Sequence, residues 1–212
     1  MDIERRFNEG LTVECRAHEG ETRAMSGYAA VFYNAEERGT EYGLGEGAVE
    51  RIMPGAFQRA ISEQDDVRAL FNHDSNQVLG RSKSGTLRLS VDARGLRYEV
   101  DAPDTSLARD LATSIERGDI TGSSFAFRVT DSEWVHEDGV DVRLVQGVEL
   151  FDVGPVTYPA YEATAASVRS EAAKFELEQA REQRQACADK CRKEECAARC
   201  RRVRVVTLEG EV

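Results

Sequence analysis

Residues 118–129 read GDITGSSFAFRV, in which a glycine and a short polar turn lead into an alternating run. The run from Phe125 to Val129 is apolar at every second position, which is typical of a β-strand with one buried face. Two serines, Ser123 and Ser124, stand at its start. Glycine and serine satisfy backbone groups in turns, but a serine at the start of a strand can also present a nucleophilic hydroxyl. That second interpretation requires a base and an orienting acid elsewhere in the chain.

Short alternating runs separated by glycine-containing turns extend on both sides of this stretch, from about residue 11 to residue 161. They predict strands, and the tripeptide Ala-Arg-Gly at 93–95 predicts a hairpin turn between two of them. The expected strands span 11–17, 25–33, 67–72, 86–91, 96–102, 123–129 and 142–153. We therefore expect a fold of the α+β class that is mainly β.

Two helices interrupt the predicted strands. Residues 53–64 carry Pro54 at a position that the first turn of a helix tolerates. Residues 104–119 begin with Asp, Thr and Ser, carry leucine and isoleucine at helical spacing, and reach a stop signal at Gly118. Both helices are expected to be insertions in the strand-rich domain.

The size and composition of the chain limit its class. Its 212 residues, 41% of them hydrophobic, are enough for one domain with a sizeable core and an appendage. The net charge of -11 argues against a nucleic-acid-binding surface built on positive charge. The N-terminus has no apolar stretch of signal-peptide length, and no run of about 18 apolar residues suggests a membrane span. We expect a soluble intracellular protein that binds neither nucleic acid nor a membrane.

The composition changes after about residue 168. Residues 171–202 are rich in Ala, Glu, Gln, Lys and Arg, so we expect a charged helix whose apolar face is too thin to dock securely. Such a helix is either solvated or held by a partner. We therefore divide the chain into a domain at 1–168 and a charged helical tail at 169–212, in which residues 203–208 either add a strand to a partner or fray.

Four of the five cysteines lie in this tail, and Cys15 stands alone in the body. At 100° per residue on one continuous helix, the first two and the last two face opposite sides, so the four cannot bind one ion. A zinc site or disulfides would need a break in the helix or a second chain. We expect no metal, and cysteines that are reduced or paired between chains: Cys187, Cys191, Cys196 and Cys200.

Each of the three histidines can be weighed as a base. His18 and His136 lie in polar surroundings and are most simply surface residues. His73 follows the apolar run 67–72 and precedes Asp74 and a polar turn. An imidazole at the end of a strand can point into a cleft and take a proton from a hydroxyl near neutral pH. A histidine that merely caps a loop would have the same sequence.

Two acids, Glu149 and Asp152, lie in the otherwise apolar stretch ELFDVGPV at 149–156. A carboxylate in such a strand is costly unless it is paired or lies at an edge. Strand parity predicts that the two side chains lie on opposite faces. At most one of them is therefore expected to face the histidine.

Five separated blocks of the sequence together resemble the phage prohead protease family, the serine proteases that mature tailed-phage capsids. The resemblance covers about residues 11–168, and the order of the blocks makes it specific. It implies a fold related to the herpesvirus assemblin proteases, with a closed or nearly closed β-barrel surrounded by helices. The blocks are IMPGAF (52–57), LFNHDSNQVLGR (70–81), GTLRLSVDARGLRYEVDAPDT (85–105), IERGDITGSSFAFRV (115–129) and ELFDVGPVTYPAYEAT (149–164).

The resemblance also implies the reacting residues. The family's histidine falls on His73, its serine on Ser124 and its acid on Asp152, with Glu149 as the reserve candidate for the acid. Ser123 is an alternative nucleophile one residue away, on the opposite face of the strand. The sequence departs from the family pattern at Ser123 in place of methionine, Ala126 in place of glycine and Gly154 in place of serine.

By the same resemblance the protein is a serine endopeptidase without a cofactor. Its partners would be scaffold segments, the N-terminal extension of the major capsid protein and copies of itself, cleaved inside the assembling prohead in the host cytoplasm. Related viral proteases work as dimers, so a dimer or higher oligomer fits the resemblance, and the tail would contact scaffold or be removed by self-cleavage. Two alternatives stay open. One is an inactive scaffold or assembly protein on the same fold, and the other is an unrelated esterase, which the absence of a G-x-S-x-G motif disfavours.

Overall fold

The computed structural model of the chain describes residues 3–8, 13–17, 23–45, 47–158, 171–190 and 202–205. Strands predominate in a mixed α+β fold, which confirms the predicted class. The strands are β1 (Glu4–Asn8), β2 (Glu14–Ala17), β3 (Arg23–Val31), β4 (Glu41–Gly45), β5 (Ala48–Ile52), β6 (Arg68–Leu70), β7 (Val78–Arg81), β8 (Leu87–Val91), β9 (Gly95–Ala102), β10 (Gly122–Glu137), β11 (Val140–Val156) and β12 (Arg202–Val205). The helices are α1 (Gln58–Ser62), α2 (Ser106–Glu116) and α4 (Glu171–Lys190).

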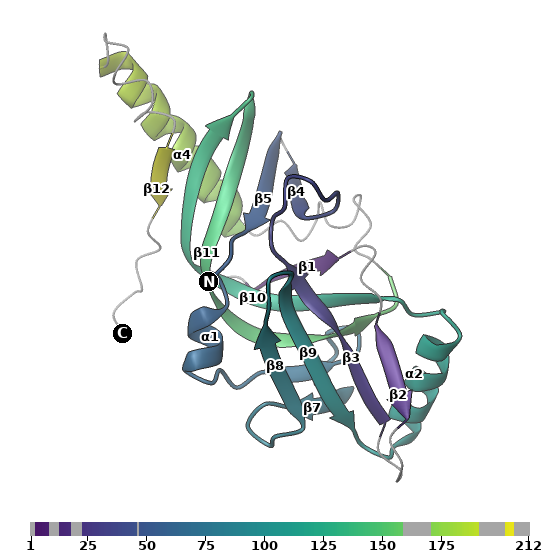
Figure 1. Ribbon diagram of the computed structural model, residues 1–212. Coiled ribbons are helices and arrows are strands. Elements are labelled where there is room, and N and C mark those ends of the chain that lie inside the picture. Colours follow the sequence, from purple (N-terminus) through teal and green to yellow (C-terminus); the bar gives the residue numbers. More distant parts are fainter. Residues whose placement is uncertain are drawn as a thin grey trace.

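The strands form two sheets (Figure 1). The larger runs in the order β1-β10-β11-β5-β4, with β12 beside β10, and with β6, itself paired with β7, beside β11. The smaller runs in the order β2-β3-β9-β8. Side chains of both sheets, such as Phe125 and Tyr98, belong to one buried core. The two sheets therefore pack against each other, and the start of β10, which belongs to the larger sheet, faces the smaller one.

Both sheets stay open along the strands that the structure describes. The larger path ends at β1 and β4, and the smaller ends at β2 and β8. A barrel requires its first and last strands to hydrogen-bond to each other. The described strands therefore do not form the closed barrel that the resemblance implied.

Aromatic side chains fix the strand on which the two serines lie. Phe125 stacks on Phe127 with ring centroids 4.7 Å apart, and it meets Phe57 edge-on at 5.7 Å. All three are fully buried, and burying one such side chain stabilises the fold by about 1.5–3 kcal/mol. The alternation noted in the sequence thus holds this face of β10 in the core.

β10 and β11 form one long antiparallel hairpin. Asp138 and Gly139, with φ of 50° and 84°, make the two-residue turn between them, as an Asp-Gly pair commonly does. Polar side chains break the alternation at residues 130–141, so the sequence pattern does not predict a strand there. The end of the hairpin away from this turn carries Ser124 and Asp152.

Helix α2 forms as predicted. The Thr105 side chain caps its first turn by accepting a hydrogen bond from the Ala108 backbone N–H at 3.3 Å. Leu111 and Ile115 are buried against the core. Gly118 follows with φ of 81°, the left-handed conformation that often ends a helix.

Helix α1 is shorter than predicted and begins only at Gln58. Pro54 lies in the turn before it, so the prediction that Pro54 occupies the first helical turn is wrong. The reason is that sheet-like bonding continues to Met53, whose backbone N–H donates to the Val145 carbonyl at 3.0 Å. The chain needs the next few residues to turn away from the sheet.

Helix α4 packs against the β10–β11 hairpin (Figure 1). Its Leu177 and Ala180 are buried with Trp134 of β10, and its Glu176 pairs with buried Arg143 at 2.8 Å. The prediction of an undocked helix is therefore wrong for this part of the helix. The docked part of the helix combines a narrow apolar face with a buried ion pair.

Beyond α4, the structure describes only residues 202–205 of the predicted tail. β12 pairs antiparallel with β10 of the same chain, so residues 202–205 form an internal strand. Cys187 lies on α4 and is disulfide-bonded, so the expectation of a reduced cysteine is wrong there. The predictions for Cys191, Cys196 and Cys200 lie outside the described residues.

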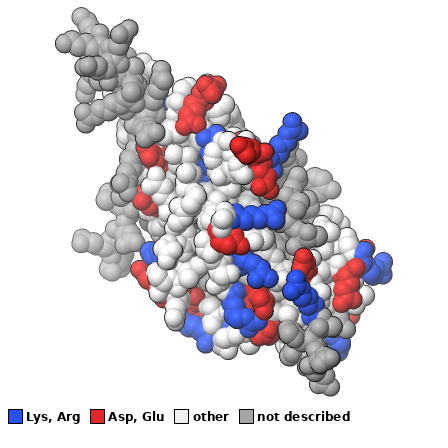
Figure 2. Space-filling model, in the orientation of Figure 1, with Lys and Arg blue, Asp and Glu red and all other residues white. Residues whose placement is uncertain are grey.

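Acidic and basic side chains lie side by side on the face shown in Figure 2. On the smaller sheet, Arg88 of β8 pairs with Asp101 at 2.6 Å and with Glu99 at 2.7 Å, both on β9. Cross-strand pairs of this kind balance charge locally.

Within the described ranges, no helix is long and apolar enough to cross a membrane.

Candidate active site

His73 lies between Ser124 and Asp152. Its Nε2 is 2.6 Å from Oγ of Ser124, and its Nδ1 is 2.5 Å from Oδ1 of Asp152. The three residues come from the turn after β6, the start of β10 and the last part of β11. Ser124 is 4% exposed and Asp152 is 8% exposed, so water competes little for these hydrogen bonds. The structure brings together the three residues that the resemblance implied.

The hydrogen-bonding order from carboxylate to imidazole to hydroxyl determines which ring nitrogen of His73 carries the hydrogen. An ionised carboxylate can only accept, so Nδ1 of His73 carries a hydrogen towards Asp152 and Nε2 is left as an acceptor. In this tautomer Nε2 can take the proton of the Ser124 hydroxyl, and the imidazolium then lies against a negative charge. The arrangement can therefore activate a serine for nucleophilic attack.

The turn that carries His73 has an unusual backbone conformation. Asn72 and His73 both have positive φ, 54° and 57°, which L-residues other than glycine adopt at a cost of about 1–2 kcal/mol. The Asn72 side chain offsets this cost: its Oδ1 accepts from the Thr157 N–H at 2.8 Å and its Nδ2 donates to the Thr157 Oγ1 at 3.0 Å. The Asn72 backbone N–H also donates to the Pro155 carbonyl at 3.1 Å. These bonds fix the turn to the end of β11. The sequence predicted His73 at a strand end, but not this turn.

Ser123 faces away from the imidazole. It is fully buried, and its Oγ lies 2.9 Å from the Tyr98 hydroxyl on the smaller sheet. Burial raises the pKa of the Tyr98 phenol, so Tyr98 stays protonated. The alternation of β10 thus directs only Ser124 towards His73, as the sequence predicted.

A bulge in β11 changes the parity of its two acids. Ala126 lies opposite Asp152, but Phe127 lies opposite Leu150, so Phe151 has no residue opposite it. One extra residue in the strand shifts the alternation, so that side chains beyond the bulge lie on the opposite face from the one expected. The carboxylates of residues 149 and 152 therefore lie on the same face, and the prediction of opposite faces is wrong.

Glu149 nevertheless does not reach the imidazole. Its carboxylate pairs with Arg128 on β10 at 2.7 Å. Asp152 alone of the two acids contacts His73. The geometry therefore favours Asp152 over the reserve candidate.

The absence of a side chain at Gly154 has a steric reason. A Cβ at this position would lie 2.0 Å from the Leu70 carbonyl oxygen. β6 therefore approaches the end of β11 closely enough to bring the following turn, with His73, to Asp152. The departure from the family's serine at this position fits that close approach.

A group that the sequence analysis missed also reaches Ser124. The hydroxyl donates to the backbone carbonyl of Arg6 at 2.8 Å. β1 pairs with β10 so that Phe7 lies opposite Ser124. The sequence of β1, ERRFN, has one aromatic residue among polar ones and no alternating pattern that would mark it as a strand.

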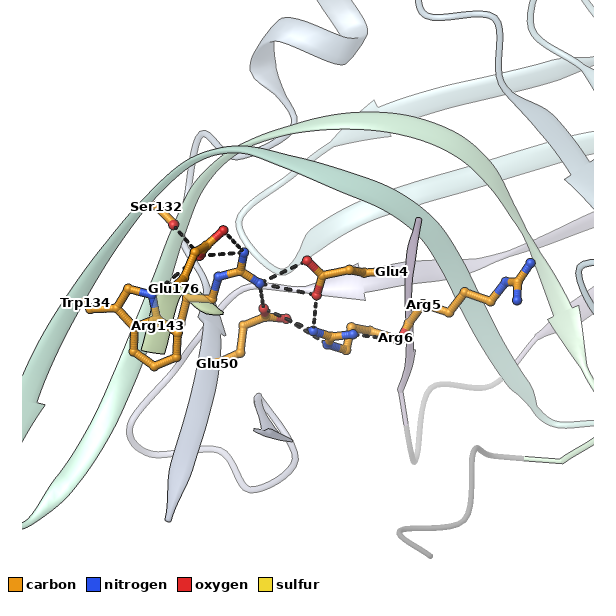
Figure 3. A network of polar contacts seen from close by, with 8 residues as sticks. All are labelled: Glu4, Arg5, Arg6, Glu50, Ser132, Trp134, Arg143 and Glu176. Carbon is orange, nitrogen blue, oxygen red and sulfur yellow. Dashed lines mark hydrogen bonds and ion pairs between the residues drawn. The ribbon is translucent and has the colours of Figure 1, made fainter. Parts of the chain in front are cut away.

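Beside β1 lies a buried cluster of charged side chains (Figure 3). Arg143, fully buried, contacts Glu4 at 3.1 Å, Glu50 at 3.0 Å and Glu176 at 2.8 Å. Arg6 contacts Glu4 at 2.6 Å and Glu50 at 2.8 Å. Burial raises the pKa of Glu176; for Glu4, burial acts in the same direction but Arg143 and Arg6 outweigh it and lower the pKa. We call these five residues the ion cluster.

Of the other two histidines, only His136 lies in the part of the chain that the structure describes, and its imidazole contacts a different acid. His136 lies near the hairpin turn, where its Nδ1 is 2.8 Å from Oδ1 of Asp141. His18 lies outside the described residues. Among the residues that are described, no three His, Cys, Asp or Glu side chains are grouped so as to hold a metal ion.

Comparison with known proteins places the chain in a family. The family model described as caudovirus prohead serine protease matches residues 11–179, most of the chain. No curated protein matches the chain. Among solved structures, that of the bacteriophage T4 capsid assembly protease, gp21, aligns with a TM-score of 0.43 and 12% identity, over 74% of this chain and 96% of that chain. On the family match, the chain belongs to the caudovirus prohead serine protease family.

Proposed function

We propose that the protein is a serine endopeptidase of capsid maturation, with Ser124 as nucleophile, His73 as general base and Asp152 as orienting acid. The observation that carries this proposal is the position of His73, whose ring nitrogens lie 2.6 Å from Ser124 and 2.5 Å from Asp152. Membership of the prohead serine protease family supports the same chemistry. The proposed substrates are scaffold segments, the N-terminal extension of the major capsid protein and copies of the protease, cut inside the assembling prohead.

The proposed reaction is acyl transfer. Nε2 of His73 removes the Ser124 proton while Oγ attacks the carbonyl carbon of the peptide, and Asp152 stabilises the imidazolium. His73 then gives this proton to the leaving amine, the C–N bond breaks, and an ester on Ser124 remains. Water, deprotonated by the same imidazole, hydrolyses the ester and restores the serine.

Mass spectrometry of proheads assembled with each variant tests the proposal. The wild type and Ser123→Ala should give discrete fragments of scaffold and capsid protein, whereas Ser124→Ala and His73→Ala should leave both intact. Ser123→Ala is the matched control because it removes a hydroxyl one residue away from the proposed nucleophile. Fragments that persist in Ser124→Ala would exclude the assignment, and intact proteins in all four samples would favour an inactive assembly protein.

We further propose that residues 1–168 form the protease domain and that the tail at 169–212 contacts scaffold or is removed by self-cleavage. The charged composition of the tail supports this role. A chain ending after residue 190 keeps α4 and tests the remainder. If residues 191–212 contact scaffold, this chain should be packaged into proheads less efficiently than the full chain, and equal amounts in purified proheads would refute a scaffold contact by these residues.

A further inference from the structure

Ser124 has one proton and two acceptors within reach. Its Oγ lies 2.6 Å from Nε2 of His73 and donates to the Arg6 carbonyl at 2.8 Å. A hydroxyl that donates to Arg6 cannot at the same time donate to His73. The hydroxyl can turn its proton to His73 by rotation about the C–O bond, but the Arg6 carbonyl occupies space beside Oγ that the carbonyl of a substrate peptide would need.

β1 lies where an extended peptide would be presented to this serine. It pairs antiparallel with β10, from Glu4 opposite Phe127 to Asn8 opposite Ser123, and it forms an edge of the larger sheet. Proteins commonly bind extended peptides by adding them as a strand to such an edge. The family match begins at residue 11, so β1 lies outside the matched part of the chain.

The Arg6 side chain is bound by residues of the neighbouring strands. Its Nε and Nη2 bind the two carboxylate oxygens of Glu50 at 2.8 and 3.2 Å, and its guanidinium carbon lies 5.5 Å from the centre of the Phe127 ring. Glu50 is fully buried on β5. A planar guanidinium can make both hydrogen bonds and the ring contact, whereas the ammonium of lysine offers only a point charge.

The side chains at neighbouring positions of β1 also contact surrounding residues. Glu4, two residues earlier, binds Arg143 at 3.1 Å. The Phe7 ring fills the space beside Gly122, where a Cβ would lie 2.1 Å from it. An acidic residue, an arginine and an aromatic residue therefore each find a matching environment along this edge.

We propose that the edge of β10 beside Ser124 binds the substrate peptide and that Glu50 is a specificity-determining residue that selects arginine. β1 occupies this edge until a substrate displaces it. The preferred peptide is extended, with arginine at the residue whose carbonyl meets Ser124, an acidic residue two positions before it and an aromatic residue after it. The inference rests on the proposed function, since it assumes that Ser124 is the nucleophile.

Displacing β1 in the full chain tests whether the substrate peptide binds at the edge of β10 beside Ser124. Arg6→Glu places a carboxylate against Glu50, whereas Arg5→Glu makes the same change in charge at a neighbouring side chain that is exposed and points away from the ion cluster (Figure 3). The rate at which a fluorophosphonate reagent labels Ser124, followed by peptide mass mapping, should rise about tenfold or more in Arg6→Glu and stay within about twofold in Arg5→Glu. Phe7→Ala, which leaves all the charges in place, should also label faster and serves if Arg6→Glu does not fold.

Competing peptides test the selection of arginine. Acetyl-Glu-Arg-Arg-Phe-Asn-amide should slow the labelling of Arg6→Glu or Phe7→Ala, and peptides with lysine or alanine at the third position should be about tenfold weaker. Three equally potent peptides would overturn the role of Glu50. Folded variants that label at the wild-type rate would overturn the placement of substrate on this edge. Failure of every variant to label at Ser124 would instead overturn the proposed function itself.

Discussion

Ser123 and Ser124 are consecutive residues whose hydroxyl groups bond to opposite sides of one sheet. The first lies 2.9 Å from the Tyr98 hydroxyl in the core, and the second lies 2.6 Å from the imidazole of His73. The alternation of a strand separates the two environments. One hydroxyl is therefore placed for packing and the other for chemistry.

This separation predicts how Ser123→Ala affects stability. The change removes a partner from the buried Tyr98 hydroxyl and should lower the free energy of unfolding by about 1–3 kcal/mol, because the desolvated hydroxyl loses its hydrogen bond. Adding Tyr98→Phe should recover most of the loss, since no polar group then remains in that place. Urea unfolding of the two single variants and the double variant measures this. Strictly additive losses would show that the two hydroxyls do not act as a pair.

Asp152→Asn should abolish most of the activity while the fold persists. An asparagine amide can donate to Nδ1 of His73, which moves the ring hydrogen to Nε2 and leaves no acceptor for the serine proton. In a well-studied serine protease the equivalent change lowers kcat by about 10⁴-fold. Glu149→Gln, which removes a carboxylate paired with Arg128, should change kcat/KM by less than about twofold. A larger effect of Glu149→Gln than of Asp152→Asn would identify Glu149, rather than Asp152, as the acid that orients His73.

Asn72→Gly tests the clamp that holds the His73 turn. Glycine accepts the positive φ but lacks the amide that binds Thr157. We expect kcat to fall about tenfold, because a histidine that is free to move spends less time within reach of Ser124. Asn76→Gly, whose side chain bonds to Asp74 in the same turn, is the control and should retain kcat. Equal activity of Asn72→Gly and the wild type would show that the clamp does not position the base.

Glu176 gives the ion cluster a pH dependence. Burial raises its pKa above the ordinary value of 4.5, so the folded chain holds this proton more tightly than the unfolded chain. The resulting stability is complete below the unfolded pKa and is lost as the pH rises through the folded pKa. Glu176→Gln has no such proton to lose. Its free energy of unfolding should therefore rise relative to that of the wild type as the pH increases above the ordinary glutamate pKa of 4.5.

Urea titrations at several pH values measure this difference. Glu178→Gln, an exposed change on the same helix, should differ from the wild type by a constant amount. A constant difference for Glu176→Gln as well would show that Glu176 ionises normally in the folded protein.

Ala180→Glu tests the docking of α4. Ala180 is fully buried against Trp134, the only tryptophan of the chain. A carboxylate there should detach the helix, because burying an unpaired charge costs several kcal/mol. Tryptophan emission should then shift to longer wavelength as water reaches the indole. Gln183→Glu, on the exposed side of α4, should leave the emission unchanged.

The sequence predicted those parts of the fold that depend on local pattern. Alternation located β10 and the hairpin of β8 and β9, and helical spacing with a glycine stop located α2. The resemblance supplied the set of His73, Ser124 and Asp152, which the structure then brings together. These features are readable because each depends on neighbouring residues or on an ordered motif.

Contacts between distant residues could not be predicted in the same way. Arg143 and Glu4 are separated by 139 positions, yet they bind in the buried ion cluster. The bulge at Phe151 changes which residues share a face, but it leaves no mark in the composition of the strand. The short segment ERRFN becomes a strand only because β10 offers it an edge, so tertiary pairing rather than local propensity decides its conformation.

The distance along the chain between the groups at the site determines when that site can exist. His73 and Asp152 are separated by 79 positions, and Ser124 and Arg6 by 118. A ribosome that has not yet synthesised residue 152 therefore carries a chain with a serine and a histidine but no acid to orient them. Pairing over such separations also forms slowly, in about milliseconds to seconds for β-rich domains. On the proposed function, the proteins around the ribosome meet this chain while it is still unable to cut them.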